Sequence, residues 1–175
     1  FFMKKALTEE IPVHKAIADI DSFFDKENAG FFKGPLKDES LTIEIAKKVF
    51  LYIFNEALCC FGQDLQHEQQ ITELLSNIMM DIYNVESTIV RAKKIFKNNK
   101  NSKVIEIAKV ISSDMVDQIE VSSRKIAVSI EKQGSSNISF KKLKKMVEEM
   151  RLNTDTIQLK REIANYVFNE NKYPY

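Results

Sequence analysis

Residues 68–96 read EQQITELLSNIMMDIYNVESTIVRAKKIF, and this stretch decides the fold of the chain. Its apolar side chains recur every three or four residues, the spacing that aligns them on one face of an α-helix. They are Ile71, Leu74, Leu75, Ile78, Ile82, Ile89 and Phe96. A helix of about 30 residues, with a rise of about 1.5 Å per residue, is a rod of about 45 Å. Because such a rod is longer than a small domain is wide, we expect other helices to lie alongside it.

The same periodicity predicts helices on both sides of this rod. One is expected over residues 41–61, with Ser40 as its N-cap and Gly62 ending it. Others are expected over residues 102–132 and 139–150, and a last one after Asp155, which forms a capping-box-like start. Because the connections are short, neighbouring helices should run antiparallel. The sequence therefore predicts an all-α fold, an antiparallel up-down helical bundle of four to five helices.

Length and the N-terminal residues suggest how the chain is organised. With 175 residues the chain can form one sizeable core. We expect residues 1–39 to be a linker with a short helix, and residues 40–175 to be the bundle domain. The chain opens on Phe1 and not on methionine, so we expect it to continue from an upstream catalytic body.

Composition excludes several classes of function. The 26 lysines and arginines balance 25 acidic residues, so the net charge of +1 gives no reason to expect a nucleic-acid partner. Four glycines leave no material for a phosphate-binding loop. The adjacent Cys59 and Cys60 cannot form a disulfide framework, and we expect them to be reduced and buried in a cytoplasmic protein. No apolar run reaches the roughly 20 residues of a membrane-spanning helix.

A search for chemistry finds no catalytic, cofactor-binding or metal site. His14 and His67 lack the spacing of metal ligands. Asp81 and Glu86 are carboxylates closely flanked by apolar residues, and they would need partners if they were partly buried. Arg91 or lysines of a neighbouring helix are candidate partners. We expect these groups to form structural ion pairs that fix helix register.

Residues 139–150 form the one amphipathic basic segment in the chain. Lys141, Lys142, Lys144 and Lys145 surround an apolar side. A segment of this type can lie on an anionic lipid surface, so these lysines are candidate lipid or anion contacts. The segment is short, however, and acidic residues follow it, so ordinary packing in the bundle is the other interpretation.

Three stretches resemble the helical C-terminal extension found in one branch of the FAD-dependent acyl-CoA dehydrogenases. The first two are FNEALCCFGQDL at residues 54–65 and QQITELLSNIMMDIYNVESTIVRAKK at residues 69–94. The second contains an Ile-Tyr-x-x-Glu-Ser core at residues 82–87. The third is DTIQLKREIANYVFNENKYPY at residues 155–175, which is similar to the usual end of those proteins.

This resemblance implies a function for a larger protein. In that family an upstream body binds FAD and the acyl-CoA, and its glutamate base and flavin oxidise the substrate in fatty-acid β-oxidation. The extension packs on the body and contributes to a homodimer or higher oligomer, sometimes with a membrane-facing segment. We therefore expect an accessory and assembly domain that is not catalytic in itself. The alternatives are a free-standing helical interaction module and a peripheral membrane-binding domain.

Overall fold

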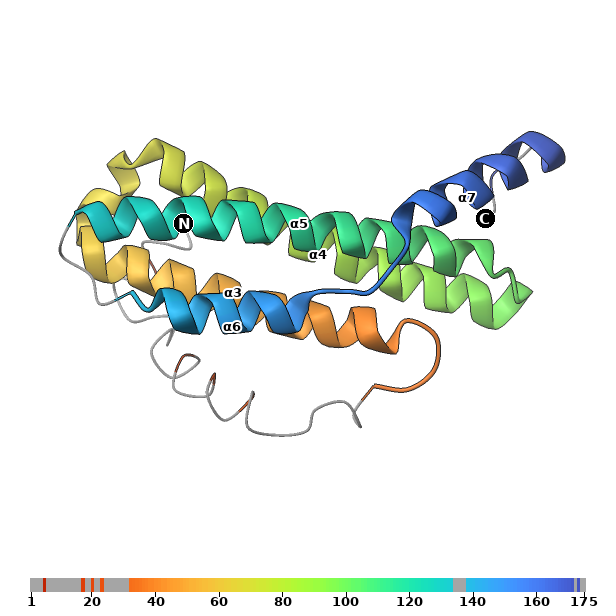
Figure 1. Ribbon diagram of the computed structural model, residues 1–175, viewed down its shortest axis with the longest axis horizontal. Helices are drawn as coiled ribbons and strands as arrows, with labels where there is room; N and C mark the ends of the chain where they lie inside the picture. The colour runs from red at the N-terminus through yellow and green to blue at the C-terminus, as the bar shows by residue number, and fades with distance from the viewer. Residues whose placement is uncertain are drawn as a thin grey trace.

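The computed structural model describes residues 32–133 and 138–171, together with Lys5, Ile17, Ile20, Phe23 and Tyr173. Its elements follow the chain in the order α3 (Lys37–Phe61), the 3-10 helix η2 (Gly62–His67), α4 (Gln69–Asn99), α5 (Lys103–Lys132), α6 (Phe140–Met150) and α7 (Thr156–Glu170). Figure 1 shows α3, α4 and α5 as long rods lying side by side, with the short α6 against α3 and with α7 projecting from one end. The expected all-α antiparallel bundle is confirmed, with five helices and no strand among the described residues.

The helix α4 packs against both α3 and α5, as its predicted length requires. Its 31 residues make a rod of about 46 Å at about 1.5 Å per residue. The side of α4 turned to its neighbours is almost the side that its periodicity predicts, and it is made of Ile71, Leu75, Ile78, Ile82, Val85, Ile89 and Ala92. These side chains join one core with the buried faces of α3, α5 and α6.

The helix α3 begins three residues before the predicted cap. Its first residue is Lys37, and its N-cap position is Leu36, whose φ of 64° lies in the left-handed region. The prediction of Ser40 as N-cap is therefore wrong. The Ser40 hydroxyl lies inside the first turn and donates to the Leu36 carbonyl oxygen at 2.6 Å. Leu36 is 3% exposed, so burial of its side chain offsets an unfavourable backbone conformation.

The helix α6 is fixed to α3 at both of its ends. At its start, the Ser139 backbone N–H donates to the Tyr52 hydroxyl at 2.8 Å, while the Ser139 side chain caps the first turn. At its end, the Thr42 hydroxyl donates to the Met150 carbonyl oxygen at 3.3 Å. Between these bonds the apolar side of α6 is buried in the bundle. The fourth position of the bundle is thus occupied by a helix less than half as long as its neighbours.

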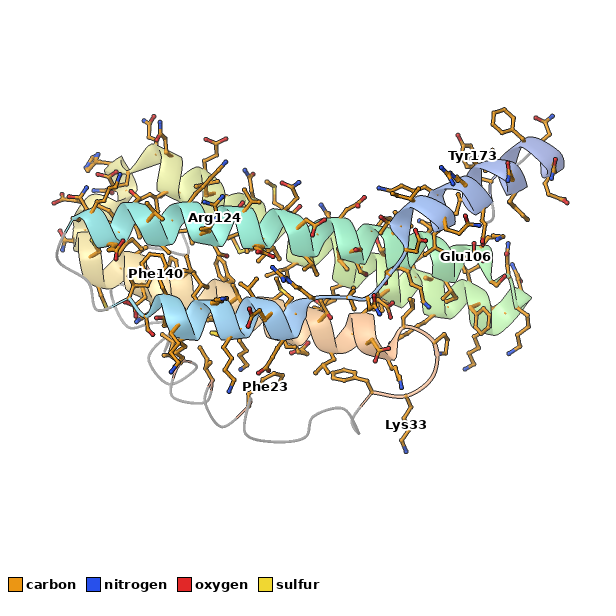
Figure 2. All side chains as sticks on the ribbon, in the orientation of Figure 1. Phe23, Lys33, Glu106, Arg124, Phe140 and Tyr173 are labelled. Carbon is orange, nitrogen blue, oxygen red and sulfur yellow. The ribbon has the colours of Figure 1, made fainter. Side chains whose placement is uncertain are left out.

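The helix α7 lies outside this core. Asp155 accepts a hydrogen bond from the Gln158 backbone N–H at 2.9 Å, so the predicted start of this helix is confirmed. The helix packs on α5, and Lys160 forms an ion pair with Asp114 there at 3.1 Å. None of its residues is buried. Figure 2 shows Tyr173 alongside α7, at the end of the molecule from which that helix projects.

The expected linker and short helix fall mostly outside the described residues. Ile17, Ile20 and Phe23 are in helical conformation, and Ile20 is fully buried in the core. The Lys48 ammonium group of α3 lies over the Phe23 ring, 5.6 Å from its centroid. The boundary between residues 39 and 40 stays a prediction, although α3 itself starts at Lys37.

Candidate functional site

Within the described ranges, no cluster of three His, Cys, Asp or Glu residues is suited to hold a metal ion. Cys59 and Cys60 are both free, and Cys59 is exposed, so its predicted burial is wrong. Partial burial raises the pKa of both thiols, and so do nearby acidic groups. A nucleophilic cysteine needs the opposite shift. Among the described helices, none is long and apolar enough to cross a membrane.

The two carboxylates singled out in the sequence lie in different surroundings. Glu86 forms an ion pair with Lys47 of α3 at 2.7 Å. Partial burial lowers the pKa of Lys47, but its hydrogen bonds to Glu86 and Glu44 outweigh that effect and raise it. Asp81 forms no ion pair with any described residue, and burial raises the pKa of its carboxyl. Arg91 is exposed on α4. The register role proposed for these groups stays a prediction.

The basic segment forms α6, and its apolar side is already occupied. Leu143, Met146, Val147 and Met150 are at most 6% exposed because they pack into the bundle. Lys144 and Lys145 point outward and form weak ion pairs with Glu148 and Glu149 at 3.8 and 3.9 Å. Lys141 is exposed, and Lys142 places its ammonium group over the Tyr52 ring. The lysines could touch an anionic surface, but the apolar side could enter a lipid layer only if α6 left the bundle.

A groove of about 300 Å³ lies between α5 and α6. Phe140, Leu143 and Val147 line it from α6, and Arg124 lines it from α5. Figure 2 shows Arg124 and Phe140 at the same end of the bundle. The charges of the groove are largely paired, since Arg151 binds Glu120 through a hydrogen bond of 2.9 Å.

Among the described residues, an uncovered apolar surface lies on α4. Met79, Met80, Tyr83 and Val90 are 43%, 55%, 67% and 63% exposed, and we call these four residues the α4 stripe. A shallow depression of about 770 Å³ follows part of it, lined in part by Tyr83 and Val90. This surface was not predicted from the sequence. The signal was present, because these apolar residues lie on the side of the helix away from Ile71, Ile78 and Ile82.

Comparison with known proteins identifies the architecture. Residues 45–145, from the first half of α3 into α6, match the sequence family described as acyl-CoA dehydrogenase, C-terminal domain. The chain belongs to this family. The matched region thus contains most of α3, all of α4 and α5, and the start of α6. The resemblance carried by residues 54–65 and 69–94 is confirmed.

Two relatives show how much of a whole dehydrogenase this C-terminal domain represents. A probable acyl-CoA dehydrogenase of Bacillus subtilis (strain 168) is 25% identical over an alignment of 178 positions, which covers 98% of this chain and 29% of that protein. The crystal structure of an acyl-CoA dehydrogenase complexed with FAD from Bacillus anthracis superposes with a TM-score of 0.77 at 21% identity. That match covers 99% of this chain and 30% of the other, and it shows a shared fold. The chain therefore spans about 30% of the length of these relatives.

Proposed function

We propose that this chain is the non-catalytic C-terminal domain of a larger FAD-dependent acyl-CoA dehydrogenase of fatty-acid β-oxidation. A body N-terminal to the bundle binds the flavin and the acyl-CoA, and the bundle contributes assembly and stability. The observation that carries this proposal is the family match over residues 45–145, within a chain less than a third as long as its relatives.

A Rossmann-type FAD site does not fit the described residues. In that type of site a glycine-rich turn between a strand and a helix lets the backbone approach the pyrophosphate. The chain has four glycines, and the described residues contain no strand. Gly62, one of the two described glycines, ends α3 and leads into η2. We therefore assign no flavin contact to this chain and place the cofactor in the body.

The complete gene product tests the enzymatic part of the proposal. Expressed with its upstream reading frame, it should carry one FAD per subunit and convert an acyl-CoA to the enoyl-CoA with an artificial electron acceptor. Absorbance of the bound flavin and assay across acyl chain lengths measure the two properties. A colourless product that oxidises no acyl-CoA would refute the proposal.

The assembly role needs a separate comparison. We expect the complete enzyme to be a cytoplasmic homodimer or higher oligomer. A form that ends before residue 32, and so lacks the bundle, should keep its flavin but lose subunits or thermal stability. Light scattering after size exclusion and the melting temperature would measure both effects. Equal mass per assembly and equal melting temperature in the two forms would show that the bundle has no such role.

A further inference from the structure

The α4 stripe belongs to a longer face of α4 that carries no charge between residues 72 and 90, and Lys94 lies on the same face one turn further on. Successive residues of a helix are 100° apart. On that geometry one arc of about 100° contains Thr72, Ser76, the four residues of the α4 stripe and Ser87. This arc runs for about 27 Å along the helix at about 1.5 Å per residue. The Thr72 hydroxyl donates to the Glu68 carbonyl oxygen, and the Ser76 hydroxyl donates to the Thr72 carbonyl oxygen. Two of its polar groups are therefore satisfied within the helix.

The exposed side of α5 shows what a solvated face looks like in the same bundle. Its apolar residues Val121 and Val128 are only 39% and 37% exposed. The exposed charged residues Arg124 and Lys125 lie between them. Because charges usually interrupt a solvated helix face, an uncharged arc with two methionines and a tyrosine is typical of a surface that is covered by protein.

We propose that the α4 stripe is the docking surface for the catalytic body of the same polypeptide. This inference rests on the proposed function, because it requires that a body exists. In the relatives, about 70% of the length lies outside the region that matches this chain. A body of that size in the same polypeptide is large enough to cover the stripe. The bundle thus binds the body through the outward side of α4.

The size and charge of the α4 stripe favour the catalytic body as its occupant over a second copy of the chain and over an anionic membrane. A stable interface between free copies buries about 1,200–2,000 Å² in total, more than one narrow helix face supplies. Two domains of one chain need less area, because the linker supplies a high effective concentration. An anionic membrane would favour a basic border, whereas the depression beside the stripe is lined by Glu86 as well as by Arg91 and Lys94.

Oxidation of methionine by hydrogen peroxide tests this proposal within one molecule. Met79 and Met80 are 43% and 55% exposed in the bundle, whereas Met115, Met146 and Met150 are at most 4% exposed and serve as internal references. In the complete flavin-loaded enzyme, Met79 and Met80 should oxidise at least tenfold more slowly than free methionine, at rates near those of the three references. Peptide mass spectrometry measures each rate. Rates for Met79 and Met80 close to that of free methionine would overturn the proposal.

A matched pair of variants shows that the stripe itself makes the contact. Met80→Glu places a charge in the stripe and should raise the oxidation rate of Met79 at least tenfold. Val128→Glu places the same charge on the exposed side of α5 and should leave that rate unchanged. Equal effects of the two variants, or no effect of Met80→Glu, would count against docking through α4.

Two further outcomes separate this inference from its competitors. Protection of Met79 that disappears on hundredfold dilution would identify a second copy as the occupant and overturn the proposal. A flavin-loaded, active enzyme with unprotected methionines would refute the docking surface while leaving the proposed function intact. A gene without an upstream body would refute the proposed function itself, and the docking surface with it.

Discussion

Ser112 and Ser123 of α5 are both fully buried, but their hydroxyl groups differ. The Ser112 hydroxyl donates to the Ala108 carbonyl oxygen at 2.8 Å. The Ser123 hydroxyl has no hydrogen-bond partner among the described residues. A buried polar group without a partner costs about 1–3 kcal/mol, whereas one with a partner costs little. The small side chain of Ser123 suits close approach of helices, but its unsatisfied hydroxyl group lowers the stability of the fold.

We expect Ser123→Ala to raise the free energy of unfolding by about 1 kcal/mol, because it removes the unsatisfied group and almost no volume. Ser112→Ala is the matched control, and it should leave stability unchanged or lower it slightly. Urea denaturation followed by circular dichroism measures both. A loss of stability in Ser123→Ala would show that this hydroxyl has a partner.

The carboxyl group of Asp81 predicts how the stability of the protein depends on pH. Burial raises its pKa, so the folded protein binds the proton more tightly than the unfolded chain does. Stability should therefore fall as the pH rises from the ordinary aspartate pKa of about 4 through the raised value, and stay lower at neutral pH. Asp81→Asn should be more stable than the wild type at pH 7, by less than about 1 kcal/mol because water still reaches the carboxylate.

The difference in stability between Asp81→Asn and the wild type should vanish below about pH 3, because Asp81 is then protonated in both the folded and the unfolded wild-type chain. Thermal unfolding of the two proteins between pH 3 and pH 8 measures this convergence. A difference that is constant with pH would mean that the carboxylate charge is not its cause.

At the scale of elements, the sequence could predict helices that obey local rules. The apolar periodicity of α4 and the cap at Asp155 need only neighbouring residues, and both predictions are confirmed. The start of α3 could not be predicted, because it depends on Leu36 adopting a left-handed backbone while its side chain enters the core. The α4 stripe was missed for a related reason, since periodicity shows where apolar residues lie but not which side has a neighbour.

The attachment of α6 is another feature that only three-dimensional structure reveals. The hydrogen bond between Ser139 and Tyr52 joins residues 87 positions apart. Tyr52→Phe removes this bond but keeps the ring beneath the Lys142 ammonium group. We expect it to lower the free energy of unfolding by about 1–2 kcal/mol, because the Ser139 N–H loses its acceptor.

In the isolated bundle, where the α4 stripe is uncovered, Tyr83→Phe is the control for Tyr52→Phe, since the Tyr83 side chain is 67% exposed there. It should change stability by less than about 0.5 kcal/mol. Amide hydrogen exchange should accelerate in α6 in the Tyr52→Phe protein only. If both variants behaved alike, the Tyr52 hydroxyl would not hold α6.

At the scale of the whole molecule, stability should be unevenly distributed. The helices α3, α4 and α5 share a continuous core, whereas α7 buries no residue and exposes 85% of Phe168. Local opening costs less where fewer apolar contacts are broken. We expect amides of α7 to exchange at least tenfold faster than amides in the middle of α4, measured by mass spectrometry on the complete gene product. Equal protection would mean that another part of the protein covers α7.

The long-range bonds to α6 also have a consequence for synthesis of the chain. The Thr42 hydroxyl can donate to the Met150 carbonyl oxygen only after Met150, 108 residues later, has been synthesised. At about 5–20 residues per second, a ribosome needs about 5–20 s to add that length. Throughout that interval the side of α3 that α6 later covers is open to other nascent chains. A nascent chain arrested when α5 has left the ribosome but α6 has not would present three long helices with this seam exposed, a state that chaperones recognise by its apolar surface.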